Sequence, residues 1–167
     1  MRVLDLFSGI GGFSLGLDRA GMETVAFCER DDFCRRILAK HWPGVPCFED
    51  VRTLNAETLA DALGLRQSQS EGRECDQRRR AVDGGENGGI ADFAIDLICG
   101  GYPCQPFSAA GKRGGAEDDR HLWPEMFRLI EELRPRWVIG ENVAGHISLG
   151  LDDVLSDLEG ADYAVQT

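Results

Sequence analysis

The sequence has no apolar run approaching the ~20 residues that a helix needs to cross a bilayer. Its N-terminus also lacks a basic stretch followed by a long apolar one, the pattern of a secretory signal. A membrane-spanning or exported protein is therefore not indicated, and we expect a cytoplasmic one. Aromatic residues are few, at 8%, but hydrophobic residues reach 43% of the 167, which is typical of a single globular domain with one sizeable core.

Metal-ligand patterns are also missing. The cysteines form no CxxC pair, and cysteine and histidine do not recur at the spacings of zinc ligands. A zinc site and a secreted disulfide framework are both unsupported, so we expect reduced thiols and no bound metal. The thiols belong to Cys28, Cys34, Cys47, Cys75, Cys99 and Cys104.

Positive charge is scarce. Lys and Arg number 18 against 29 Asp and Glu, which gives a formal net charge of −11, and residues 142–167 contain no Lys or Arg at all. A protein that holds a long stretch of phosphate backbone does so through many basic side chains. This chain is poorly suited to that task alone, so any role on nucleic acid requires additional surface.

Apolar runs alternate with helical patterns along most of the chain. The runs predict strands at Val3–Phe7, Thr24–Cys28, Val45–Phe48, Phe93–Cys99 and Trp137–Gly140, with another strand starting at Tyr163–Val165. Helices are predicted at Phe13–Ala20, from Asp31 or Asp32 to a stop at Pro43 with Phe33, Ile37 and Leu38 on one face, at Ala56–Leu63 after an Asn55 cap, at Arg120–Leu133 and at Leu151–Leu158. This alternation predicts an α/β fold, a doubly wound and mostly parallel sheet with helices on both faces.

Residues 64–92 interrupt the alternation. They are rich in Gly, Gln and Ser and include the run Arg78-Arg79-Arg80. We interpret them as a disordered surface insertion within one domain, 1–167. Acidic residues separate the arginines, so a solvated loop is favoured over a phosphate-binding segment.

Polar or reactive side chains follow five of the predicted strands. In parallel sheets ligands bind beyond the carboxyl ends of the strands, near the point where strand order reverses, so these groups should gather there. They are Ser8, Glu29, Asp50, Cys104 and Glu141.

The glycines after the first strand and the acid after the second have the spacing of a nucleoside-cofactor site. Gly9, Gly11 and Gly12 let the backbone approach a ligand at a helix N-terminus, which favours negative charge. Glu29 lies about 20 residues further on, where an acid usually binds ribose hydroxyls. A tight turn without ligand, and a surface charge cluster around Glu29, are the plain alternatives.

The remaining strand ends each allow two interpretations. Asp50 could accept a hydrogen bond from an adenine amino group or cap the next segment. Glu141 could have its pKa raised by desolvation, as a proton donor requires, or be an ordinary strand-end acid. Cys104 lies between Pro103 and Pro106, which restrict the turn; it is a displayed nucleophile or a buried structural thiol.

Three segments together resemble the DNA cytosine-5 methyltransferases: DLFSGIGG at residues 5–12, GYPCQPFS at 101–108 and ENV at 141–143. Their order and spacing match that family, and the resemblance covers residues 1–59 and 94–167. It implies a Rossmann-like, S-adenosyl-methionine-dependent methyltransferase fold.

The resemblance also implies the site. Cys104 would add to C6 of a flipped cytosine in double-stranded DNA, and Glu141 would donate a proton or hydrogen bond at N3. S-adenosyl-L-methionine would be the cofactor, bound through its methionine and adenosyl parts by Phe7, Ser8, Gly9, Ile10, Gly11 and Gly12, through its ribose by Glu29, through its adenine by Asp50 and Val51, and along one wall by Gly101, Pro103 and Leu122.

Beyond Thr167 the family pattern would continue with an arginine-bearing strand, a target-recognition region and a last helix. We therefore expect a C-terminally truncated or split enzyme, with a possible second chain carrying target recognition. A non-catalytic remnant that binds cofactor or a partner is the alternative. The hypothesis of a nicotinamide dehydrogenase is supported only by the glycine turn and Glu29. An enzyme acting on RNA is a further alternative.

Overall fold

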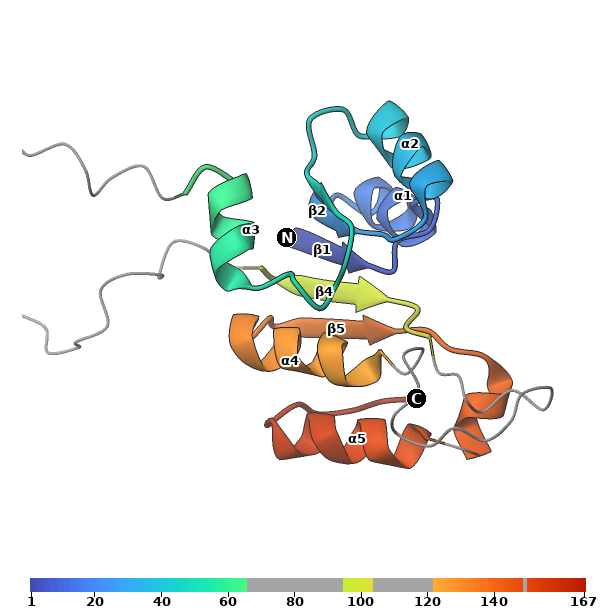
Figure 1. Cartoon of the computed structure of the whole chain (residues 1–167). Helices are drawn as coiled ribbons and strands as arrows, with labels where there is room; N and C mark the ends of the chain where they lie inside the picture. The colour runs from blue at the N-terminus through green and yellow to red at the C-terminus, as the bar shows by residue number, and fades with distance from the viewer. Residues whose placement is uncertain (66–94, 104–121, 149) are drawn as a thin grey trace, which may run out of the picture.

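The computed structural model describes residues 1–65, 95–103, 122–148 and 150–167 (Figure 1). Most of the expected insertion at 64–92 lies outside the described residues, and so does Cys104. The described strands form one five-stranded sheet in the order β3-β2-β1-β4-β5, and every neighbouring pair is parallel. Their bounds are β1 Arg2–Leu6, β2 Glu23–Cys28, β3 Cys47–Phe48, β4 Leu97–Gly100 and β5 Trp137–Gly140.

Helices cover both faces of this sheet (Figure 1). Side chains of α1 and the loop after it pack on Val3, Leu97 and Cys99, and the opposite face packs against α3, α4 and α5. This arrangement confirms the predicted α/β class. The helices are α1 Gly12–Arg19, α2 Asp32–His41, α3 Ala56–Ala62, α4 Trp123–Leu133 and α5 Leu151–Gly160, with a 3-10 helix, η1, at Ala144–Ser148.

The predicted helix starts have local causes. Asp31 is the N-cap of α2, and its carboxylate accepts a hydrogen bond from the Cys34 amide at 2.9 Å. Asn55 and Thr58 form a reciprocal capping box at the start of α3, with the Asn55 side chain accepting from the Thr58 amide at 2.8 Å. Both helices therefore begin where the sequence predicted.

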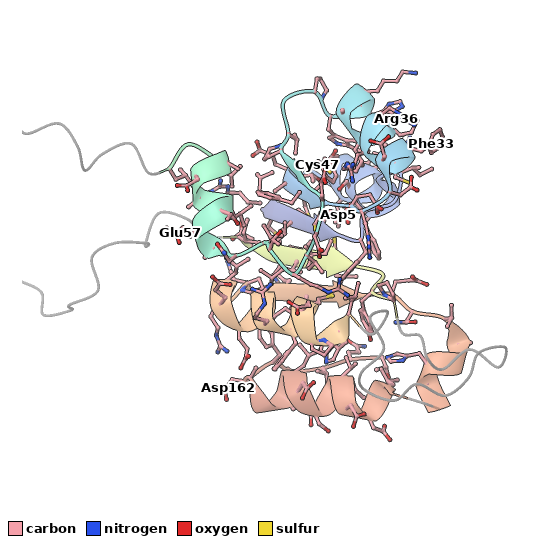
Figure 2. All side chains as sticks on the ribbon, in the orientation of Figure 1. Asp5, Phe33, Arg36, Cys47, Glu57 and Asp162 are labelled. Carbon is pink, nitrogen blue, oxygen red and sulfur yellow. The ribbon has the colours of Figure 1, made fainter. Side chains whose placement is uncertain are left out.

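Two predictions were wrong. Phe33 does not share a buried face with Leu38: it is 60% exposed, as its position on the outer side of α2 in Figure 2 illustrates, whereas Leu38 is 1% exposed. The two residues lie five apart, roughly 140° around a helix axis. Residues 163–167 form no strand, because Asp162 (φ 67°) turns the chain after α5 and the Tyr163 hydroxyl donates to the Pro135 carbonyl oxygen at 2.7 Å.

Candidate functional site

The carboxyl ends of the strands meet at one edge of the sheet, where the arrowheads of β1, β4 and β5 point the same way in Figure 1. Strand order runs outward through β2 and β3 on one side of β1 and through β4 and β5 on the other, so the reversal lies between β1 and β4. Residues 7–12 follow β1, residues 101–103 follow β4, and residues 141–143 follow β5. These three segments therefore lie at the same edge of the sheet as the switch point, where α/β proteins bind ligands.

The turn after β1 has an unusual backbone. Phe7, Gly9 and Gly11 all have positive φ, at 54°, 53° and 88°. A non-glycine residue held there costs about 1–3 kcal/mol, so the surroundings must impose it. Ser8 supplies one such constraint, since its amide donates to the Cys28 carbonyl oxygen at 3.2 Å and ties the turn to the end of β2.

This turn exposes backbone where a ligand could approach. A Cβ built on Gly9 or Gly12 meets no atom of the described residues within 4 Å, and the intervening Ile10 is 61% exposed. The helix that follows, α1, begins without a side-chain cap and without an acidic residue in its first turn. An open helix N-terminus of this kind suits a negatively charged group.

Glu29 joins the turn to the start of α2. One of its carboxylate oxygens accepts from the Gly9 amide and the other from the Asp31 amide, both at 2.7 Å. These bonds place Glu29 in the same site as the glycine turn, rather than in an isolated charge cluster. Carboxylate oxygens carry further lone pairs, so ribose hydroxyls can be added without breaking either bond.

Asp50 caps its own turn. Its carboxylate accepts from the Arg52 amide at 3.0 Å, and its carbonyl oxygen accepts from the Thr53 amide at 3.1 Å. These bonds favour the capping interpretation of the described structure. Val51 is 4% exposed, and its carbonyl oxygen accepts from an Arg128 Nη2 at 3.0 Å.

The ends of β4 and β5 are close together. A Cβ built on Gly101 would lie 2.8 Å from a Glu141 carboxylate oxygen, and the Glu141 amide donates to the Gly100 carbonyl oxygen at 3.1 Å. The carbonyl oxygen of Pro103 accepts from the amide of Leu122, the N-cap of α4, at 3.2 Å. The Glu141 side chain is exposed among the described residues, so the desolvation that one of its two interpretations requires is not found there.

Sequence reasoning gave no role to Asp5, which is fully buried in β1 (Figure 2). One carboxylate oxygen accepts from the Ser14 hydroxyl at 2.6 Å, and the other has no nitrogen or oxygen donor among the described residues. The Cys99 thiol, a weak donor, lies opposite Asp5 in the β1–β4 register. Burial raises the pKa of the Asp5 carboxyl to about 6. Its signal in the sequence is a lone acid inside an apolar strand.

Sequence reasoning also missed a set of hydrogen-bonded polar side chains in the loops that follow β4 and β5. Asn142 donates from its side chain to the Tyr102 carbonyl oxygen at 3.0 Å, and the Tyr102 hydroxyl lies 2.9 Å from Nε2 of the buried His146. No spacing rule links positions 102 and 146, because the sheet brings them together.

Other classes of site have no support in the described ranges. No three His, Cys, Asp or Glu side chains there could share a metal ion, and none of the helices described is long and apolar enough to span a bilayer.

Comparison with known proteins agrees with this geometry. The family model described as C-5 cytosine-specific DNA methylase matches residues 1–167. Type II methyltransferase M2.BsuMI of Bacillus subtilis is 32% identical over all of this chain and 37% of its own length. Type II methyltransferase M.AquIA of a Picosynechococcus species is 30% identical over 88% of this chain and 50% of its own length. The chain thus spans half or less of these relatives.

Solved structures give the same result. A DNA modification methyltransferase encoded within an E. coli prophage is 29% identical, with a TM-score of 0.67 over 96% of this chain and 37% of its own. A Spodoptera frugiperda DNMT2 mutant, 18% identical, shares the fold with a TM-score of 0.62. Since the family model matches the chain from residue 1 to residue 167, the chain belongs to the C-5 cytosine-specific DNA methylase family.

Proposed function

We propose that this chain is the cofactor-binding and catalytic part of an enzyme that methylates C5 of cytosine in DNA. The observation that carries the proposal is the meeting of three segments at one sheet edge: the open glycine turn with Glu29, the segment that leads into Cys104, and Glu141 beside Gly101. A nicotinamide dehydrogenase would share the glycine turn but leaves Cys104 and Glu141 without a role.

S-adenosyl-L-methionine, when bound, supplies the methyl group that C5 of the base accepts. The open backbone at Gly9 and Gly12 and the N-terminus of α1 would hold its methionine carboxylate, and Glu29 would hold its ribose. Val51 is a proposed adenine neighbour, and so is Asp50 in addition to capping its own turn. The same pocket would include Phe7, Ser8, Ile10, Gly11, Gly101, Pro103 and Leu122.

The proposed chemistry begins at a cytosine flipped out of the duplex. The Cys104 thiolate forms a bond to C6, and the electron pair displaced from the C5–C6 double bond makes C5 nucleophilic. Glu141 donates a hydrogen bond or proton at N3, which stabilises the negative charge entering the ring. After methyl transfer, a base removes the C5 proton, the double bond re-forms, and the C6–S bond breaks to release the thiolate.

Deprotonation of Cys104 is a requirement of this scheme. A free thiol has a pKa of ~8.5 and is only a few per cent ionised at neutral pH. The enzyme must therefore lower that pKa or supply a base before attack on C6 can be fast.

We further propose that a target-recognition portion, in the same polypeptide or in a second chain, packs beside β5. Trp137 and Ile139 on this outer strand are 59% and 39% exposed, and Val143 and Ile147 just beyond it are 64% and 66% exposed. Large exposed apolar side chains that gather at one edge of a sheet are typical of an interaction surface, and Trp137 and Ile139 lie on the same face of this edge strand. A basic partner would also supply the positive charge that a chain of net charge −11 lacks for DNA.

Trapping on fluorinated DNA tests the reaction. In duplex DNA replicated with 5-fluorodeoxycytidine triphosphate, C5 carries fluorine instead of a proton, so the C6–S bond cannot be released after methylation. We expect the enzyme, assembled with its target-recognition portion and S-adenosyl-methionine, to form a denaturation-resistant adduct. Cys104→Ser should abolish it, and Cys34→Ser, at a half-buried thiol of α2, should leave it unchanged.

A measurement of cofactor binding distinguishes the alternative, a non-catalytic remnant. If calorimetry detects S-adenosyl-methionine binding but the assembled enzyme gives no adduct, a non-catalytic cofactor-binding remnant is the correct interpretation.

A further inference from the structure

Tyr102 and His146 form a buried polar pair behind the strand ends. Their side chains are 5% and 4% exposed, and the tyrosine hydroxyl lies 2.9 Å from the imidazole Nε2. Tyr102 comes two residues after β4, and His146 belongs to η1, which follows β5. The pair therefore links two loops that are distant in the sequence but follow neighbouring strands of the sheet.

The tyrosine ring is fixed to the helical layer. Its centroid lies 5.0 Å from that of Trp123, the first residue of α4, in a tilted contact. The Trp123 indole N–H in turn donates to an Asp157 carboxylate oxygen on α5 at 2.8 Å. Because α4 and α5 both hold Trp123, the Tyr102 ring rests on a surface with little freedom to shift.

Hydrogen bonds to the main chain also join these two loops. Asn142 donates from its side chain to the Tyr102 carbonyl oxygen at 3.0 Å, and the Glu141 amide donates to the Gly100 carbonyl oxygen at 3.1 Å. Residues 100–103 are thus bonded to residues 141–146 through both main chain and side chain. The Glu141 carboxylate lies over Gly101, where a built Cβ would be 2.8 Å from one of its oxygens.

A polar pair at this place needs an explanation. Phenylalanine and leucine could occupy much of the same volume without desolvating a hydroxyl and an imidazole. A buried hydrogen bond, in contrast to apolar packing, constrains both distance and direction, and so it favours one arrangement of the two loops over nearby ones.

We infer that Tyr102 and His146 are positioning residues that hold the segment Gly101–Pro103, which leads directly into Cys104, in one geometry against Glu141. The inference rests on the proposed function, because the geometry matters when Cys104 and Glu141 act on the same base. In this role the pair acts through the position of the segment, not on the base itself.

The test compares Tyr102→Phe, His146→Leu and the double variant. Each single change removes one partner of a buried hydrogen bond and should lower the melting temperature. The double variant replaces both partners by apolar groups, so its melting temperature should return most of the way to the wild-type value. We expect amide hydrogen exchange in residues 141–146 to be at least threefold faster in all three variants. In the assembled enzyme the rate of adduct formation with fluorinated DNA should fall at least tenfold in all three, with S-adenosyl-methionine affinity changed less than twofold.

Matched controls remove the same groups elsewhere. Tyr163→Phe deletes a hydroxyl that donates to a backbone carbonyl, and His41→Leu replaces an exposed histidine; both should keep wild-type exchange in residues 141–146. Recovery of wild-type exchange by the double variant, together with its stability, would show a merely structural pair and overturn the inference. A wild-type enzyme that forms no adduct would contradict the proposed function instead, while the exchange measurement would still decide the role of the pair.

Discussion

Asp5 is a carboxyl group inside the central strand, and its ionisation opposes folding. The unfolded chain loses this proton near the ordinary pKa of ~3.9, whereas burial raises the pKa in the folded protein to about 6, against the hydrogen bond from Ser14 that lowers it. Between these values the unfolded state is the less protonated one. The Asp5 contribution to stability therefore decreases as pH rises from about 4 to about 6 and is constant above that.

Replacing Asp5 by Asn removes this dependence while keeping an oxygen that can accept from Ser14. We expect the free energy of unfolding of Asp5→Asn, relative to wild type, to rise by roughly 3 kcal/mol between pH 4 and pH 7, the size of a two-unit pKa difference. Urea titrations at four pH values measure it. The exposed Asp153→Asn is the control and should show no such trend. A difference that stays flat with pH would mean that Asp5 is ionised in the folded protein throughout.

At the scale of elements, glycines of one turn differ in what they tolerate. Gly11 has φ 88°, and a Cβ there would lie 2.6 Å from the Trp42 ring, which cannot easily move because its N–H donates to Asp18 at 2.6 Å. A Cβ on Gly12, the first residue of α1, would meet no atom within 4 Å in the part of the chain that the structure describes. Local glycine spacing could not reveal the overlap, because Trp42 follows α2 and is distant in the sequence; the positive φ of Gly11 is the local part of the difference.

We therefore expect Gly11→Ala to lower the free energy of unfolding by at least about 2 kcal/mol, from left-handed strain and the overlap with Trp42. Gly12→Ala should be neutral or stabilising by up to ~1 kcal/mol, because alanine is the better helix former. Thermal or urea denaturation of the two variants side by side is sufficient. Equal losses would show that the turn, rather than Trp42, sets the requirement for glycine.

What the sequence predicted well is local in origin. The caps Asp31 and Asn55, the glycine turn and the apolar strands all follow from neighbours within a few positions. The errors and omissions depend on distant contacts: Phe33 was placed on a buried stripe that α2 does not use, and the pairing of Tyr102 with His146 requires β4 and β5 to be adjacent first. Cys104 lies outside the described residues, so its role remains a prediction.

At the scale of the whole molecule, β5 extends the sheet face on which α1 packs. In the parallel register Trp137 lies beside Leu97 and Ile139 beside Cys99. The two β4 residues are buried in the cluster beneath α1, at 1% and 0% exposure, whereas their neighbours on β5 are 59% and 39% exposed. The apolar face thus extends one strand beyond the helix that covers it, which is the physical reason to expect a further portion of the enzyme there.

Trp137 can report whether that portion binds. Of the three tryptophans, Trp123 is 4% exposed and Trp42 packs against Phe27, so acrylamide should quench mainly Trp137. The difference between wild type and Trp137→Phe isolates its signal, and we expect its quenching constant to fall at least twofold when the target-recognition portion is present. Trp137→Asp should weaken that association at least tenfold, since an unpaired charge would be buried in an apolar contact. Unchanged quenching in an assembled, active enzyme would place the contact elsewhere and leave the exposed β5 face without this explanation.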